Sequence, residues 1–525
     1  MGLCVSATSR VRFTGRIGQR ATCGKSQLQR YASPVMPIDL CVKHGNSRHT
    51  APIHILDDDS LLHVFYLYRP FLLGEDDKDK DTFLVGGRGS WVRGRWWYKL
   101  AHVCQRWRNL ILGSPTYLGI FLVCTCGTPV ADMLAHSPPL PLIIDYSYVK
   151  DLNTEDEERA ILALKQCDRI HRVRLGMAVT SLQKLVSFMD EEYPILEYLI
   201  IRPPPKDRSS ILILPETLQA PHLRHLTLVG FALPIGSRLL AAAVGLVTLY
   251  LFMNDPSTYF HPNSLLRWLS FMPQLETLVI GFFFAVPNRE IERQLTLTPT
   301  ITTATLPNLH LIKYRGVSAY LEALVQQITT SRLEKLHVYY FNQLTFSIPR
   351  LVQFMNTTEN LRFDSGRFRF DDDKVYVHMY PRDRAEMNPF FINVDSWYLD
   401  WQVSSVAQIF NSLSQLSSAV EHLTLKHVVH SRSSEGHNEV DRTEWRKLLR
   451  PFRNVKTLWI GNGLVEQLSR CLELEDGELP MELLPELQEL TYSRSGDTGD
   501  AFTSFINARQ NAGRPVTVVT AYRPR

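Results

Sequence analysis

The sequence predicts an α/β protein in which a small N-terminal helical domain precedes an irregular solenoid of strands and helices, curved like a horseshoe. Two stretches with helical apolar periodicity lie within residues 51–118. From about residue 168, a short apolar pattern recurs, mostly at intervals of 23 to 35 residues. Segments with helical periodicity separate its copies. We therefore expect a basic tail at 1–50, the helical domain at 51–118 and the solenoid at 119–525.

The N-terminal tail has no periodicity and holds most of the net charge. Residues 1–38 contain six basic residues and no acidic one, so the chain's charge of +4 becomes +4 − 6 = −2 without them. Three interpretations remain open. Gly2 and Cys4 fit an acylation signal, the arginine-rich composition suits a mitochondrial transit peptide, and the simplest alternative is a disordered tail.

Two amphipathic stretches make up the expected helical domain. Residues 56–65 carry an apolar face, and the aspartates at 57–59 can cap the N-terminus of a helix. Residues 97–111 place tryptophans, leucine, cysteine and isoleucine on one helical stripe, and Gly113 and Pro115 stop it. A charged, glycine-containing loop is expected between them, at about 72–95.

Together these stretches resemble the F-box. The second half of that motif is matched by Val103-Cys104-Gln105-Arg106-Trp107-Arg108 and Ser114-Pro115. The first half departs from it, because Asp57 stands where proline is usual, and the charged loop separates the halves.

The resemblance implies that these helices bind a Skp-type adaptor protein. The residues expected to form the F-box core and its adaptor-facing surface are Leu61, Leu62, Phe65, Leu100, Val103, Cys104, Trp107 and Ile111. Trp107 is the strongest candidate for a binding anchor, because buried tryptophans dominate such interfaces. The alternatives are that Trp107 is internal core, or that residues 97–111 form a core helix of an unrelated domain.

The C-terminal part repeats an apolar pattern of the form apolar-x-x-apolar-x-apolar, which is typical of an irregular leucine-rich repeat. Copies begin at residues 170, 196, 223, 246, 275, 309, 333, 420, 455 and 487. Each copy predicts a short strand that buries its apolar side chains only when neighbouring copies stack on it. Helices are expected at 263–272, 318–328 and 404–416, which gives a right-handed parallel solenoid. A doubly wound α/β domain is the alternative.

The interval of 87 residues between the copies at 333 and 420 interrupts the series. Residues 367–370, 375–377 and 390–392 alternate with the period of a strand. We expect one or two degenerate repeats there, with a solvated charged turn at 371–374.

The order of F-box and repeats resembles the F-box proteins that are abundant in mushroom-forming (basidiomycete) fungi, a likeness that residues 56–70, 103–115 and 399–406 carry. It implies that the repeats capture a protein substrate. Residues between the inward leucines face the concave side, and the expected substrate-facing residues are Thr248, Tyr250, Lys335, His337, Tyr339, Thr457 and Trp459.

Other functional classes find little support in the sequence. No catalytic motif or glycine-rich phosphate loop is present, so we expect no enzyme and no cofactor. The eight cysteines lack the paired spacing of a zinc site, and no apolar run is long enough to cross a bilayer. Free thiols and a cytoplasmic or nuclear location are therefore expected.

The expected function is that of a substrate-recognition adaptor in a cullin–RING (SCF-type) ubiquitin ligase. The partners are a Skp-type adaptor with its ligase and an unknown protein substrate. Two alternatives stay open: a repeat scaffold without ligase coupling, and an RNA-binding protein. The latter would use Arg88, Arg93 and Arg95 with Trp91, Trp96 and Trp97, because aromatic rings among arginines can stack on single-stranded bases. The charge balance gives no general case for nucleic-acid binding.

Overall fold

The computed structural model describes residues 55–68, 96–147, 149, 152–204, 211–233, 236–283, 303–341, 343, 345–384, 388–428, 440–473, 482–493 and 501–521. The chain divides into two compact units, residues 1–57 and 58–525, and every helix and strand given below lies in the second. The tail expected at 1–50, with its three interpretations, and the charged loop expected at 72–95 lie outside the described residues.

Four short helices open the second unit. Their bounds are α1 Asp58–Tyr68, α2 Trp96–Ala101, α3 Gln105–Gly113 and α4 Pro115–Leu118. The single helix expected at 97–111 is wrong, because the chain breaks at residues 102–104 and Cys104 is extended, with φ −159° and ψ 169°. This break turns one apolar stripe into two helices that pack on each other, since Trp97, Ala101, Trp107 and Ile111 are all buried.

Sixteen strands of the described residues form one sheet, which is parallel except for one strand. Its first nine strands in spatial order are β1 Leu122–Cys124, β2 Leu142–Tyr146, β3 Ile170–Leu175, β4 Tyr198–Ile201, β6 His225–Val229, β8 Thr248–Met253, β9 Thr277–Phe282, β11 Leu311–Gly316 and β13 Lys335–Tyr340. The remaining seven are β16 Phe390–Asp395, β15 Lys374–Tyr380, β14 Ser365–Phe370, β17 His422–His427, β18 Thr457–Ile460, β19 Glu489–Ser493 and β20 Thr517–Ala521. Two small parallel pairs, β5 Leu212–Ile213 with β7 Phe231–Ala232 and β10 Ala304–Thr305 with β12 Ile328–Thr329, lie beside it.

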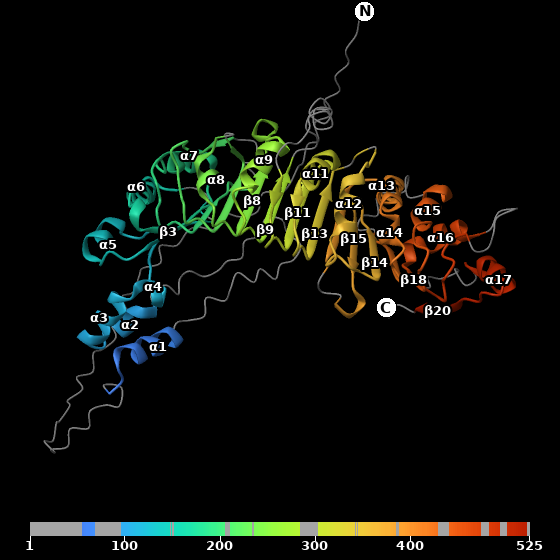
Figure 1. Ribbon diagram of the computed structural model, residues 1–525, viewed down its shortest axis with the longest axis horizontal. Coiled ribbons are helices and arrows are strands. Elements are labelled where there is room, and N and C mark those ends of the chain that lie inside the picture. Colours follow the sequence, from blue (N-terminus) through green and yellow to red (C-terminus); the bar gives the residue numbers. More distant parts are fainter. Residues whose placement is uncertain are drawn as a thin grey trace, which may run out of the picture. The chain divides into compact units, whose positions relative to one another are not determined.

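Helices connect the strands and cover one face of the sheet (Figure 1). They are α5 Val130–His136, α6 Thr154–Leu164, α7 Val179–Ser187, α8 Arg238–Ala242, α9 Pro262–Leu269, α11 Ser318–Val325, α12 Pro349–Thr357, α13 Leu399–Ser412, α14 Ser414–Ser417, α15 Arg442–Leu449, α16 Val465–Leu472 and α17 Thr503–Asn511. The expected helices correspond to α9, α11 and α13, and α13 begins at Leu399 rather than at residue 404.

The repeat pattern is confirmed as the source of the sheet. Each of its ten copies contributes a strand, and the first apolar residue is buried in every one, as at Leu196, Leu246 and Leu487. The chain therefore forms an α/β solenoid of leucine-rich-repeat type. Strands β1, β2 and β20 lack the pattern, so the array begins before residue 168, although within the range expected for it.

The interrupted stretch does not contain further parallel repeats, which corrects that expectation. Strands β14, β15 and β16 form an antiparallel meander that enters the sheet in reverse order, between β13 and β17. The outer two strands run parallel to their solenoid neighbours. A three-stranded meander keeps both flanking strands in the common direction, so the sheet continues without an edge.

The turn of this meander is only partly solvated. Asp371 is buried and accepts a hydrogen bond from Arg369 Nε at 2.8 Å. Gln402 of α13 donates through Nε2 to the Asp371 carbonyl oxygen at 2.7 Å. The charged turn expected at 371–374 is therefore tied to the helical layer.

Candidate protein-interaction surfaces

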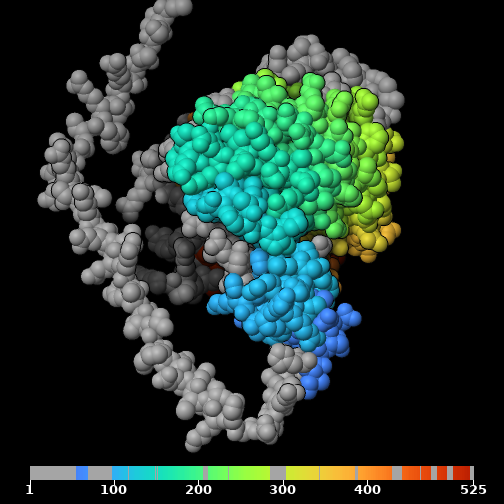
Figure 2. Space-filling view, turned by 90° about the vertical axis from the view of Figure 1, so that its left-hand side faces the viewer, coloured from blue at the N-terminus to red at the C-terminus, as the bar shows by residue number. Residues whose placement is uncertain are grey.

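The two halves of the F-box-like motif pack together. The rings of Phe65 on α1 and Trp107 on α3 meet edge to face with centroids 4.8 Å apart. Arg106 donates to Asp58 Oδ1 from Nε at 2.9 Å and from Nη2 at 2.7 Å. Figure 2 shows α1, in blue, lying against the light-blue residues of α2 to α4. The residues between the halves in the sequence do not prevent this pairing.

The expected adaptor-binding residues divide by burial. Leu61, Phe65, Trp107 and Ile111 are internal core, each no more than 9% exposed. This places Trp107 in the alternative role that the sequence left open. Leu62, Leu100 and Cys104 are half-buried, whereas Val103 is 57% exposed at the break between α2 and α3.

A second set of apolar side chains on the same helices is exposed, and the sequence had not predicted it. On α1, Val64 is 43% exposed, Leu67 68% and Tyr68 61%. Tyr66 packs against Tyr117, beyond α3, with ring centroids 5.4 Å apart. Val64 and Leu67 are three residues apart, which places them on one side of α1 next to the buried Leu61 and Phe65, so a helical projection contained this signal. An 11-residue helix with apolar groups on both faces is typical of a segment that a partner covers.

The expected substrate-facing residues all lie on the open face of the sheet, opposite the helices. Each alternates with buried neighbours and is itself half-buried. They occupy three separate places, on β8, β13 and β18. On β8, Tyr250 packs against an apolar cluster of Val229, Phe252 and Val279. Thr248 lies in the adjacent row, between His225 and Thr277.

The antiparallel meander joins two of these places into one surface. Across β11 to β18, one row of register partners is Lys313, His337, Phe391, His378, Arg367, Thr424 and Trp459. The adjacent row is Arg315, Tyr339, Asn393, Tyr376, Arg369 and Lys426. We call these two rows the aromatic–basic surface.

The centre of this surface is a cluster of aromatic rings around Phe391. His378 lies 4.7 Å from it, Tyr339 5.1 Å, His337 5.6 Å and Tyr376 6.2 Å, measured between ring centroids. Phe391 is only 5% exposed, so its neighbours cover it. The sequence did not predict the contributions of the meander, because the reversed strand order is not encoded in a local pattern.

Cationic side chains lie on both sides of the aromatic centre. Arg315 pairs with Asp395 at 2.8 Å, and Arg369 pairs with Asp371 at the same distance. Arg367 lies over the Tyr380 ring at 5.6 Å, and Lys426 lies over the Trp459 ring at 4.6 Å.

These cations affect the ionisation of their neighbours. Burial lowers the pKa of Lys426, and the positive charges of Arg367 and Arg369 act in the same direction. Burial likewise lowers the pKa of His337 to about 3, with further contributions from Lys313, Lys335 and His378. Burial is the main cause of both shifts, and neighbouring positive charges act in the same direction.

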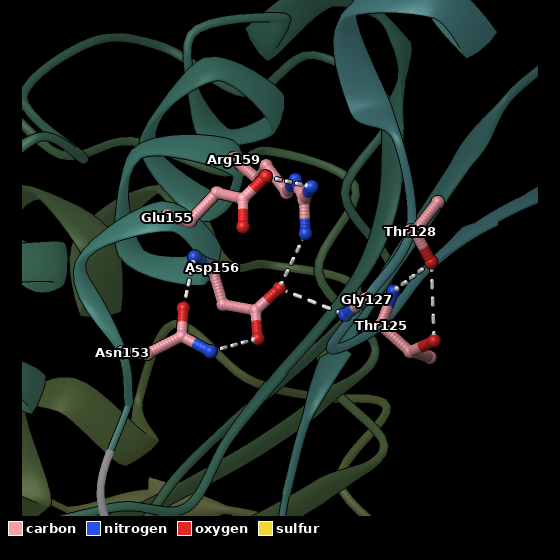
Figure 3. A network of polar contacts seen from close by, with 7 residues as sticks. All are labelled: Thr125, Gly127, Thr128, Asn153, Glu155, Asp156 and Arg159. Atoms are coloured by element: carbon pink, nitrogen blue, oxygen red, sulfur yellow. Dashed lines mark hydrogen bonds and ion pairs between the residues drawn. The ribbon is translucent and has the colours of Figure 1, made fainter. Parts of the chain in front are cut away.

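A polar network around the buried Asp156, near the start of the array, has a structural role (Figure 3). Asp156, at the N-terminal end of α6, accepts from the Gly127 N–H at 2.7 Å and from Asn153 Nδ2 at 3.0 Å. Arg159 donates to the same carboxylate at 3.1 Å. These donors, the Gly127 N–H first, lower the pKa of Asp156. The partners come from α6 itself, from the residue before it and from the turn after β1, so the network fastens α6 to that turn.

Other candidate chemistry has little geometric support. Within the described ranges, no three His, Cys, Asp or Glu side chains come close enough to hold a metal ion. No helix in those ranges is both long and apolar enough to cross a membrane. For the RNA alternative, Trp97 is buried and cannot stack on bases, whereas Arg88, Trp91, Arg93 and Arg95 lie outside the described residues.

Comparisons with known proteins leave the family open. No family model matches the chain, and no curated protein matches it. Among solved structures, the chain is similar to the crystal structure of the leucine-rich repeat-containing protein LegL7 from Legionella pneumophila, at 12% identity and a TM-score of 0.23. The match covers 75% of this chain and 98% of that one. A TM-score this low carries no argument, so the repeat architecture rests on the sheet and its register.

Proposed function

We propose that the chain is a substrate adaptor of a cullin–RING (SCF-type) ubiquitin ligase. Its F-box-like helices bind a Skp-type adaptor, and its solenoid binds the protein to be ubiquitinated. The chain performs no bond chemistry itself. It raises the local concentration of the substrate near the charged conjugating enzyme.

The observation that carries this proposal is the packing of α1 on α3, with an apolar surface left over. The Phe65–Trp107 contact and the Arg106–Asp58 ion pair hold the two motif halves together. The exposed Val64, Leu67 and Val103 then supply apolar area for a partner. The fungal F-box resemblance names the Skp-type adaptor as that partner.

Co-expression with a Skp-type adaptor, followed by co-purification, tests the proposal. The informative variants are Val64→Asp with Leu67→Asp, and Val103→Asp, because these side chains are exposed and their loss leaves the core intact. Val244→Asp is a matched control, since Val244 is 53% exposed and lies in the solenoid. We expect wild type and control to co-purify with the adaptor and the two test variants to lose it, because a buried charge without a partner weakens an interface strongly.

The opposite outcome is equally clear. If the wild type forms no complex with the adaptor, ligase coupling is wrong. The coarser proposal, a leucine-rich-repeat scaffold for protein interaction, would then remain, because the open face of the solenoid does not depend on the helices.

A further inference from the structure

We infer that the aromatic–basic surface binds an extended acidic segment of a partner protein. This deepens the proposed function, because it rests on the solenoid as the protein-binding part and assigns the chemistry of what it binds. Three features of the surface support it: the spacing of its cations, their mutual repulsion and the carboxylates among them.

The spacing of the cations defines the length of the segment. Lys313 and Arg315 lie on β11, and Arg367 and Arg369 lie on β14, four strand positions away in the sheet. With about 4.8 Å between neighbouring strands, the two groups are roughly 19 Å apart. An extended chain rises about 3.3 Å per residue, so about six residues span this distance. In such a segment, acidic side chains at the two ends would lie near the two groups of cations, and an apolar residue between them would lie near the aromatic centre.

The repulsion among the cations gives the segment its affinity. Burial lowers the pKa of Lys426, and the charges of Arg367 and Arg369 on the neighbouring strand lower it further. A folded protein that concentrates like charges in this way is stabilised by an anion that comes close to them. Acidic side chains of a partner that approach this face of the sheet therefore meet a favourable electrostatic potential before any direct contact forms.

Carboxylates on the surface favour a peptide over a nucleic acid. Asp395 and Asp371 lie beside Arg315 and Arg369, where they would repel the continuous charge of a phosphate backbone. The aromatic rings are also poorly disposed for base stacking. Phe391 is covered by its neighbours, and Lys426 occupies one face of Trp459. Separate carboxylates can each meet one cation without approaching Asp395 or Asp371.

Fluorescence anisotropy with the full chain tests this inference. The probe is a fluorescein-labelled decapeptide with two glutamates at each end and six residues between them, glycine, leucine, valine, leucine, valine and glycine. The comparison peptide has lysine at the four charged positions. We expect the acidic peptide to bind at least about tenfold more tightly, and its affinity to fall between about 50 mM and about 200 mM salt.

Charge reversal locates the binding. Arg367→Glu with Arg369→Glu is expected to weaken binding of the acidic peptide by at least about tenfold. Arg267→Glu, on the exposed side of α9, is the control and is expected to bind as the wild type does. Lys426→Gln removes a charge without adding a carboxylate, which keeps the test informative if the double variant does not fold by circular dichroism.

Three results would overturn the inference. They are equal binding of the two peptides, loss of binding in Arg267→Glu as much as in the test variants, and tighter binding of a ten-nucleotide oligouridylate than of the acidic peptide. The assay contains no Skp-type adaptor. If the acidic peptide does not bind but the chain co-purifies with the adaptor, only the inference about the acidic segment is rejected. If the peptide binds but the chain does not co-purify with the adaptor, only ligase coupling is rejected.

Discussion

At the scale of single residues, burial is the main cause of the lowered pKa of His337. His337 lies in the same row of the aromatic–basic surface as Lys313 and His378, in a half-buried position where its Nε2 lies 3.2 Å from the Asn388 carbonyl oxygen. The Nε2–H therefore donates to that oxygen, and the neutral imidazole is the form that fits.

This gives His337 a defined effect on acid stability. Its pKa is lowered to about 3 in the folded chain, mainly by burial, whereas an unfolded chain binds the proton below about pH 6.5. The contribution of neutral His337 to stability is thus fully present above about pH 6.5 and is lost progressively as the pH falls towards about 3. We expect His337→Gln, which keeps a donor for Asn388, to lose less stability than wild type between about pH 7 and about pH 4.5.

Urea denaturation at several pH values measures this effect. His171, His422 and His427 also have lowered pKa values and contribute to the slope of both proteins, so only the difference between wild type and variant is informative. Parallel pH profiles would show that His337 titrates normally in the folded chain.

At the scale of elements, the helices of the F-box-like part carry buried side chains that stabilise the fold and exposed side chains that are available for binding. Trp107 lies edge to face against Phe65 and is 9% exposed, whereas Val103 is 57% exposed. We expect Trp107→Ala to destabilise this pair by about 3–5 kcal/mol, the usual cost of a large-to-small aromatic substitution in a core. Val103→Asp should change stability by no more than about 0.5 kcal/mol.

Hydrogen exchange of the amides of α1 and α3 distinguishes the two variants. Faster exchange is expected in Trp107→Ala and unchanged exchange in Val103→Asp. Unchanged protection in Trp107→Ala would mean that the Phe65 contact does not hold α1 in place.

At the scale of the whole molecule, the solenoid has no single central core. Each strand pairs only with the strands beside it, so stability is approximately a sum of local terms. Leu249 on β8 and Leu490 on β19 are both fully buried, but β8 lies in the interior of the array and β19 is next to its last strand.

Substitution of these leucines by alanine tests how far a defect spreads. Each change is expected to cost about 2–5 kcal/mol locally. In Leu490→Ala, faster hydrogen exchange should be confined to β18, β19 and β20, whereas Leu249→Ala should affect strands on both sides of β8. Uniformly faster exchange along the chain in either variant would indicate one cooperative core instead.

The sequence by itself determined the repeat, because burial on one face of a short strand imposes a pattern that can be read locally. It placed ten strands and the half-buried residues between them, including His337, Tyr339 and Trp459. It also predicted the amphipathic stretches that become α1 and the pair α2 and α3. These are short-range features, fixed by the periods of strand and helix.

Only the tertiary structure decided which surfaces these elements form. The burial of Trp107 depends on α1, whose Phe65 lies 42 residues before it in the sequence. The aromatic–basic surface depends on strands β14 to β16 entering the sheet in reverse, which brings Arg367 beside Thr424 and Phe391 beside His337. Strand order is a long-range property, set by which edges pair, and no local pattern encodes it.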